Sequence, residues 1–146
     1  MIELNGSDLD LRGLERIAVA RVDVGLSDSA RKDVHVARDF VTRLLERDEA
    51  IYGVTTGFGR LAEVVISPEH QGELQRNLIR SHSAGVGPPM PAEEVRAIMT
   101  LRANALARGH SGCRVDVIDL LLEFLNRRIH PVVPRFGSVG ASGDLA

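Results

Sequence analysis

Three small residues near the end of the printed sequence, Ala141-Ser142-Gly143, have the types and the order needed to build an electrophile from backbone atoms. Glycine lets one stretch of backbone approach another closely, so the Gly143 nitrogen could attack the Ala141 carbonyl carbon. Loss of water from the resulting ring and from the Ser142 side chain would leave an electron-poor alkene. Side chains supply no comparable electrophile, which enzymes otherwise take from cofactors. The alternative is a plain Gly/Ser turn, with Ser142 or Asp144 capping the next helix.

Two further glycine-rich loops carry groups that could move a proton or bind a polar ring. The loop over residues 51–59 contains Tyr52 and ends at Gly59. A tyrosine in such a loop can act as a general base. The segment Ser81-His82-Ser83 precedes another glycine-rich run, and His82 could act as a base or recognise a second polar ring. A packed loop tyrosine and a helix-terminal histidine are the structural alternatives.

Several other chemistries lack their residue patterns in this chain. No Gly-Lys-Ser/Thr phosphate loop and no Gly-x-Ser-x-Gly elbow is present. The five histidines lack metal-ligand spacing and Cys113 is the single cysteine, so we expect neither a metal site nor an internal disulfide. A net charge of -2 argues against nucleic-acid binding. Without a signal peptide or a bilayer-spanning apolar run, the sequence predicts a cytoplasmic protein that does not bind membranes.

The remaining sequence predicts the helices that must position these loops. Hydrophobic residues make up 44% of the 146 and aromatic residues only 3%, which predicts a core of Leu, Val, Ile and Ala. Acidic residues alternate with the arginines, which predicts a solvated charged surface. Apolar spacing predicts helices over about residues 8–18, 28–48, 67–82, 91–108 and 114–128. Ser27 is expected to cap the second of these helices, and Gly109 to end the fourth. The wide apolar face of the last one predicts burial among other helices.

Two short segments, Ile2–Leu4 and Arg21–Val24, are expected to pair as strands. The fold class is therefore predicted to be mainly α-helical with a minor short β-hairpin. No composition shift or linker marks a boundary, so residues 1–146 are expected to form one region.

The order and spacing of the three loops resemble those of the aromatic amino-acid ammonia-lyases and aminomutases. Tyr52-Gly53-Val54-Thr55-Thr56-Gly57-Phe58-Gly59 is similar to the family's tyrosine loop. Gly140-Ala141-Ser142-Gly143-Asp144-Leu145 is similar to the signature of its self-made 4-methylidene-imidazol-5-one group (MIO). Residues 101–112 are similar to the histidine branch. The resemblance covers essentially this whole chain but only about the first third of a usual member, so we expect an N-terminal region that is inactive alone.

The resemblance implies a role for each of these residues. Ala141, Ser142 and Gly143 would form the prosthetic group, with Asp144 in support, and ring closure is expected to be impaired in this chain alone. Tyr52 would remove the β-proton of the substrate, and Gly59 would let the substrate approach the backbone. The implied fold is the fumarase/aspartase-like fold of the ammonia-lyases. The implied assembly is a homotetramer whose sites draw on several subunits, with no metal or diffusible cofactor.

The pair Ser81-His82 predicts the substrate. Members of the family specific for phenylalanine usually carry Phe-Leu at this position, those for tyrosine His-Leu, and those for histidine Ser-His. A histidine here can exchange a hydrogen bond with a substrate imidazole. The expected reaction is L-histidine to trans-urocanate and ammonia, the first step of histidine degradation. Thr55 departs from the asparagine common in the histidine branch, so a tyrosine or phenylalanine lyase or aminomutase stays open, as does a non-catalytic helical assembly module.

Overall fold

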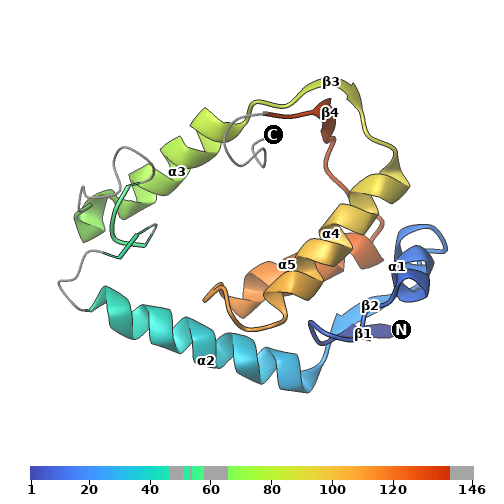
Figure 1. Ribbon diagram of the computed structural model, residues 1–146, viewed down its shortest axis with the longest axis horizontal. Coiled ribbons are helices and arrows are strands. Elements are labelled where there is room, and N and C mark those ends of the chain that lie inside the picture. Colours follow the sequence, from blue (N-terminus) through green and yellow to red (C-terminus); the bar gives the residue numbers. More distant parts are fainter. Residues whose placement is uncertain (47–50, 53, 58–65, 139–146) are drawn as a thin grey trace. The chain divides into compact units, whose positions relative to one another are not determined.

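The computed structural model describes residues 1–46, 51, 52, 54–57 and 66–138, whose elements are labelled in Figure 1. The chain divides into two compact units. The first comprises Met1–Val41 and Met90–Val133, and the second comprises Thr42–Pro89 and Pro134–Ala146. Each unit combines two separate stretches of chain, so the division falls at no single point of the sequence. That residues 1–146 form one region of a longer enzyme stays a prediction.

The helices of the first unit begin and end where local signals place them. Its elements are β1 (Ile2–Leu4), α1 (Leu11–Ala18), β2 (Val24–Leu26), most of α2 (Asp28–Leu45), α4 (Ala92–Leu106) and α5 (Val115–Asn126). Asp10 caps α1 by accepting a hydrogen bond from the Gly13 N–H at 2.7 Å. Ser27, the predicted cap of α2, accepts the Ala30 N–H at 3.2 Å.

Beyond α4, the turn toward α5 requires a glycine. Gly109 has a φ of +68°, and a side chain there would come within 2.7 Å of the Asp33 carbonyl carbon. The prediction that this residue ends the helix is therefore confirmed. Asp33 belongs to α2, so this close approach also packs the turn against that helix.

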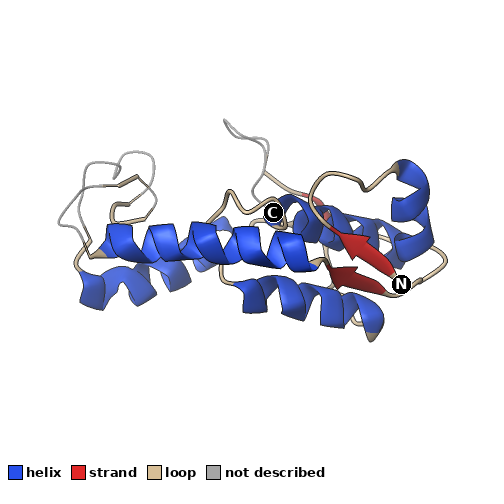
Figure 2. Ribbon diagram, turned by 90° about the horizontal axis from the view of Figure 1, so that it is seen from below, coloured by secondary structure: helices blue, strands red, loops and turns tan. Residues whose placement is uncertain are grey.

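The two N-terminal strands correct one prediction. β1 and β2 run parallel, with Ile2 opposite Val24 and Leu4 opposite Leu26, and their arrows point the same way in Figure 2. The predicted hairpin is wrong, and the second strand begins at Val24 rather than Arg21. Two parallel strands need a connection that brings the chain back to the end at which the first strand began. The segment with α1, which lies between the strands in the sequence, provides this connection. Asn126 then holds the Val24 backbone through two hydrogen bonds of 2.9 Å each.

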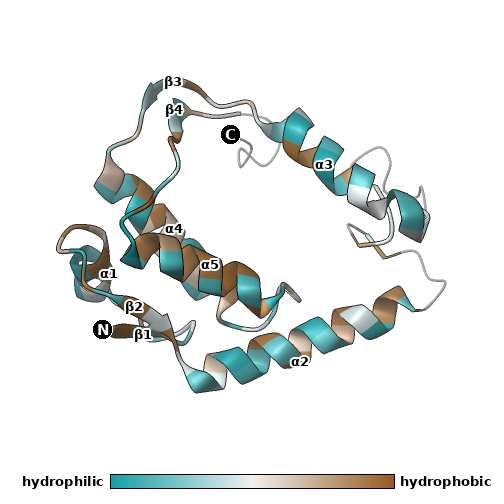
Figure 3. Ribbon diagram, turned by 180° about the vertical axis from the view of Figure 1, so that it is seen from behind, coloured by the Kyte–Doolittle hydropathy of each residue, from teal (hydrophilic) through white to brown (hydrophobic). Residues whose placement is uncertain are grey.

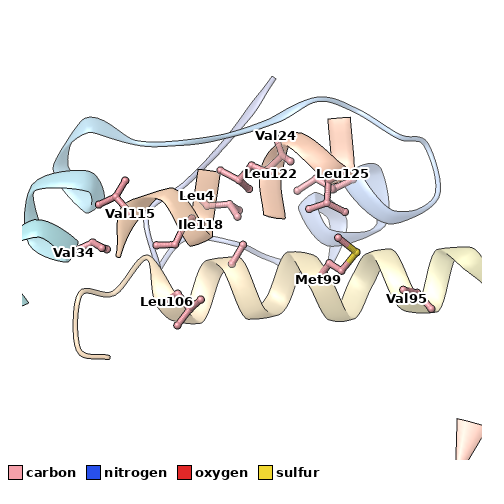
Figure 4. Close-up of a cluster of buried hydrophobic side chains, with 12 residues drawn as sticks. Leu4, Val24, Val34, Val95, Met99, Leu106, Val115, Ile118, Leu122 and Leu125 are labelled. Atoms are coloured by element: carbon pink, nitrogen blue, oxygen red, sulfur yellow. The ribbon is translucent and has the colours of Figure 1, made fainter. Parts of the chain in front are cut away.

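Aliphatic side chains form the core of the first unit, as the composition predicts (Figure 4). In this unit α1 packs on α4, and α4 packs on α5. Full burial of each large aliphatic side chain contributes about 1.5–3 kcal/mol. The buried cluster contains Leu4, Ile17, Val24, Val34, Val95, Met99, Ala103, Leu106, Val115, Ile118, Leu122 and Leu125.

The outer side of α5 does not follow its prediction. Hydrophobic residues run along this helix in Figure 3. Val117 and Leu120 are nevertheless 40% and 51% exposed. Burial of α5 among other helices is therefore confirmed for one face and wrong for the other, because no described element covers that second face.

One arginine contradicts the predicted solvated surface. Arg96 in α4 is only 3% exposed. Its guanidinium donates to the carbonyl oxygens of Ala18 (3.1 Å), Ile17 (2.8 Å) and Leu125 (2.8 Å). These carbonyls lie in the last turns of α1 and α5, where helical partners are missing and the helix dipole is negative. Arg96 thereby joins three helices, while its burial lowers its pKa from the ordinary value.

The second unit carries η2 (Pro68–His70), α3 (Gln71–His82), β3 (Val86–Pro89) and β4 (Pro134–Phe136). The helix predicted from residue 67 begins at Gln71, because a 3₁₀ turn closed by the His70 N–H and the Ser67 carbonyl (2.9 Å) precedes it. β3 and β4 pair antiparallel. Among the described residues, no helix combines the length and the apolar character that crossing a membrane requires.

Candidate active site

Tyr52 lies in a tight turn of the second unit. The Val54 and Thr55 N–H groups both donate to the Ile51 carbonyl, at 3.0 and 2.9 Å. The Thr55 hydroxyl in turn accepts the Ile51 N–H at 2.7 Å. The turn is thus closed on both sides, and Tyr52 is 63% exposed on it. A tyrosine presented in this way is accessible to a substrate.

The residues after Tyr52 anchor the turn. Thr55 and Thr56 are 7% and 1% exposed. The Thr56 hydroxyl donates to the Gly57 carbonyl at 3.0 Å, and the Thr55 carbonyl accepts the Ile66 N–H at 2.8 Å. Thr55, which stands where the histidine branch commonly has asparagine, therefore has a structural role, because its hydroxyl closes the turn. An asparagine oxygen could accept the same hydrogen bond.

The end of α3 positions Ser81 and His82, the pair predicted to recognise the substrate. The Ser81 and Ser83 hydroxyls donate to the carbonyls of Leu78 (3.0 Å) and Ile79 (2.6 Å). Because α3 ends at His82, the Ile79 carbonyl is one of the four that have no partner within the helix. The Ser81 Oγ also lies 2.8 Å from His82 Nδ1.

The chain then turns sharply after His82. At Ser83 the backbone has φ -77° and ψ +71°, and the Ala84 N–H donates to the His82 carbonyl at 2.9 Å. This is an inverse γ-turn. The helix therefore stops at His82, whose side chain is half-buried.

The pair of strands β3 and β4 connects this helix end with the approach to Ala141-Ser142-Gly143. Val86, four residues after His82, lies opposite Phe136. Gly87 has a φ of +91°, and a side chain there would come within 2.5 Å of the Phe136 ring. The ring therefore needs glycine beneath it. The pairing sets the strand that follows His82 beside the strand that leads toward Ala141.

The described residues do not join all predicted site residues in one pocket. The turn with Tyr52 is tied to Ile66, ahead of α3, whereas His82 ends that helix, which is about 18 Å long. Five predicted site residues, Gly59, Ala141, Ser142, Gly143 and Asp144, lie outside the described residues. Their roles stay predictions.

A hollow near the start of α3 involves side chains that sequence analysis did not single out. Its lining comprises Ile66, His70, Glu73, Leu74 and Asn77. Spacing of three and four residues from His70 to Asn77 places these groups on one helical face, which is the signal that could have identified them. Among the residues that the structure describes, no three His, Cys, Asp or Glu side chains gather closely enough to hold a metal ion.

Curated and solved proteins similar to this chain include histidine ammonia-lyases and a tyrosine aminomutase. The histidine ammonia-lyase of Natranaerobius thermophilus is 45% identical over all 146 residues, which make up 29% of its own length. A tyrosine aminomutase structure from Streptomyces globisporus matches 95% of the chain with a TM-score of 0.90 and 37% identity, over 26% of that protein. The histidine ammonia-lyase structure from Trypanosoma cruzi matches 95% of the chain with a TM-score of 0.86 and 34% identity, over 27% of that protein.

The chain thus spans less than a third of the length of the relatives that it matches. The mainly helical fold agrees with the N-terminal region of these enzymes. The family model described as aromatic amino acid lyase matches residues 9–146, so the chain is a member of the aromatic amino acid lyase family.

Proposed function

We propose that the polypeptide to which this chain belongs is a histidine ammonia-lyase, converting L-histidine to trans-urocanate and ammonia. The observation that supports this most is the 45% identity with a histidine ammonia-lyase over every residue of the chain. The pair Ser81-His82 at the end of α3 supports the same substrate. The 146 residues alone are proposed to be inactive, since they represent about 29% of that relative.

Ala141, Ser142 and Gly143 have the composition that the MIO group requires. These three residues would form it by cyclisation and loss of two waters, and when formed it supplies an electrophile for the substrate amine. Asp144, which follows directly, is proposed to support the loop. The pairing of β3 with β4 favours this role, because it holds the strand that leads toward Ala141 beside the one that leaves His82.

Tyr52 is proposed to remove the β-proton of the substrate. That proton is weakly acidic, so the base must be held in place rather than recruited from solvent. The double closure between Ile51 and Thr55 provides that positioning, and the exposed ring of Tyr52 is accessible to a substrate. Gly59 is proposed to leave room for the substrate beside this loop.

The pair Ser81-His82 is proposed to form the substrate-binding position, with His82 as the side chain that meets the substrate ring. An imidazole that meets a histidine can form a hydrogen bond, whereas one that meets leucine would remain unpaired at a cost of about 1–3 kcal/mol. We further propose a cytoplasmic homotetramer whose sites combine residues of several subunits. Such an assembly would allow the Tyr52 turn and the end of α3, which do not meet in the described residues, to serve one site.

A second candidate is a tyrosine-specific enzyme of the same family. Two observations favour it: the TM-score of 0.90 to a tyrosine aminomutase, and Thr55 in place of the asparagine common in the histidine branch. The closure of the Tyr52 turn by Thr55 weakens the second of these, because it gives the threonine a structural role independent of the substrate.

Assays of the complete polypeptide encoded by the gene decide between these candidates. L-histidine, L-tyrosine and L-phenylalanine are supplied in turn, and ammonia, urocanate and β-amino acids are measured. The proposal expects urocanate and equimolar ammonia from histidine. Production of β-tyrosine or of coumarate, with no turnover of histidine, would establish the tyrosine enzyme instead.

Replacing the recognition residue sharpens the same experiment. His82→Leu is expected to lower kcat/KM for histidine by roughly 10–100-fold, because the substrate imidazole loses its partner. His70→Leu, at the other end of α3, removes a histidine without touching the recognition pair and serves as the control. Equal losses in both variants would show that His82 has no specific role.

A further inference from the structure

The two hydrogen-bond contacts of Ser81 bear on which ring nitrogen of His82 carries the proton. Ser81 Oγ lies 3.0 Å from the Leu78 carbonyl oxygen and 2.8 Å from His82 Nδ1. A carbonyl oxygen can only accept a hydrogen bond, so both contacts can be hydrogen bonds at the same time only if the single hydroxyl proton of Ser81 points to Leu78. The hydroxyl oxygen then has only lone pairs to offer His82. The second hydrogen bond forms only when Nδ1 carries a hydrogen and donates it.

The polarity of the opposite side of the ring follows. A neutral imidazole carries one ring proton, so a protonated Nδ1 leaves a lone pair on Nε2. His82 is the last residue of α3, half-buried beside the γ-turn at Ser83. A ring held in this tautomer presents a hydrogen-bond acceptor, not a donor, to whatever meets its Nε2 edge.

We propose that Ser81 is a positioning residue that fixes His82 in the Nδ1–H tautomer, so that the site selects substrates whose ring presents an N–H or O–H donor. The part of this inference that concerns substrate rests on the proposed function. A neutral substrate imidazole supplies one N–H for the Nε2 acceptor. Phenylalanine supplies none and would leave the acceptor without a partner.

Ser83 separates this role from an ordinary contribution to the helix end. Its hydroxyl also donates to a carbonyl of the last helical turn, that of Ile79, at 2.6 Å. Unlike Ser81, it makes no contact with the His82 ring among the hydrogen bonds of the described residues. Ser83→Ala and Ser81→Ala therefore each remove one capping hydroxyl, but only the second removes the acceptor for Nδ1–H.

The tautomer can be measured directly in the 146-residue chain. ¹⁵N NMR of labelled histidine rings distinguishes protonated from unprotonated Nδ1, and His82→Gln identifies the signal by its disappearance. With the ring neutral, the wild type, Ser81→Thr and Ser83→Ala are expected to show Nδ1–H. Ser81→Ala is expected to show a substantial Nε2–H population. A wild-type ring protonated on Nε2, or a tautomer unchanged in Ser81→Ala, would overturn the proposal.

Kinetics of the complete polypeptide test the consequence for substrate selection. Ser81→Ala is expected to raise KM for histidine about tenfold with a smaller change in kcat, and Ser81→Thr to restore it. Ser83→Ala is expected to keep the wild-type KM. An unchanged KM in Ser81→Ala would refute the selective role. Failure of the proposed function is distinct: the wild type would then release no ammonia from histidine, while the NMR result would hold.

Discussion

The two units of this chain differ in what they bury. Each buried hydrophobic side chain of the described residues belongs to the first unit, from Leu4 to Leu125. In the second unit the buried side chains among the described residues are Thr55 and Thr56, and no described residue of α3 is buried. The first unit is therefore organised by apolar packing and the second by hydrogen bonds at turns and helix ends.

All predicted site residues belong to the second unit, from Tyr52 to Asp144. Binding and catalytic residues commonly lie on loops that a packed scaffold supports. Stability is therefore assigned to residues of the first unit, and the proposed chemistry to residues of the second. Substitutions in the first unit should change the free energy of unfolding, whereas substitutions in the second should change local structure or activity.

The largest effect on stability is expected at Arg96. Arg96→Met removes the side-chain donor of three carbonyl oxygens in the buried junction of α1, α4 and α5. Of the three, the Leu125 carbonyl also accepts the Arg128 N–H, at 3.2 Å. The free energy of unfolding should fall by about 3–5 kcal/mol. Urea denaturation followed by circular dichroism measures it. Arg102→Met, an exposed position of the same helix, should change it by less than about 0.5 kcal/mol. Equal losses for Arg96→Met and Arg102→Met would show that the buried hydrogen bonds of Arg96 do not stabilise the first unit.

A pair of isoleucines contrasts the two units more directly. Ile118 is 0% exposed in the first unit, whereas Ile79 is 69% exposed in the second. Ile118→Ala should lower the free energy of unfolding by about 2–4 kcal/mol through lost burial and a cavity. Ile79→Ala should leave it nearly unchanged. A larger loss for Ile79→Ala in the same denaturation experiment would mean that α3 is packed after all.

An ion pair of the first unit should give a small, pH-dependent effect. Arg31 binds both carboxylate oxygens of Asp119, at 2.6 and 2.9 Å. These hydrogen bonds lower the pKa of Asp119, so the pair contributes above about pH 4 and its contribution is lost as the pH falls through the folded-state pKa. Because both side chains are partly exposed, Asp119→Asn should cost less than about 1 kcal/mol at neutral pH.

The pH series provides the check on that ion pair. The stability difference between wild type and Asp119→Asn should shrink as the pH falls below about 4. Asp116→Asn, which breaks the more exposed pair with Arg114, is the control and should show little difference at any pH. A stability difference between wild type and Asp119→Asn that grows as the pH falls would contradict a stabilising ion pair between Arg31 and Asp119.

A local effect, without a change in the global free energy of unfolding, is expected in the second unit, at the Tyr52 turn. Thr55→Val removes the acceptor of the Ile51 N–H, whereas Thr55→Asn retains an acceptor oxygen. Hydrogen exchange of the Ile51 amide should accelerate roughly fivefold in the valine variant, which corresponds to about 1 kcal/mol of local stability. The asparagine variant should exchange more slowly than the valine variant. Equal exchange in all three proteins would remove the structural role of Thr55.

Local signals in the sequence were sufficient to predict much of the first unit. Ser27 caps a helix and Gly109 ends α4 as predicted, and the first helix begins at the predicted place, where Asp10 caps it, because capping and left-handed turns depend on a few neighbouring residues. Long-range features were not predictable in this way. The parallel direction of β1 and β2, and the burial of Arg96, depend on how distant helices pack. A single arginine gives no periodic signal that its carbonyl partners lie on two other helices.

The candidate site was predictable by residue type but not by geometry. Sequence motifs identified Tyr52, Ser81 and His82, yet the shared hydroxyl of Ser81 became visible only from distances. Similarly, the role of Thr55 in closing the turn required the structure. The roles of Gly59 and of residues 141–144 remain predictions from sequence, because they lie outside the described residues.

Removal of the Tyr52 hydroxyl is the most direct test of whether the second unit contains the proposed catalytic residues. In the complete polypeptide, Tyr52→Phe should lower kcat for ammonia release from histidine by about 10²–10⁴-fold, the usual contribution of a general base. The urea midpoint should stay at the wild-type value, because phenylalanine keeps the ring and only the hydroxyl of an exposed residue is removed. Wild-type turnover in this variant, or a loss of activity that only follows unfolding, would contradict the account.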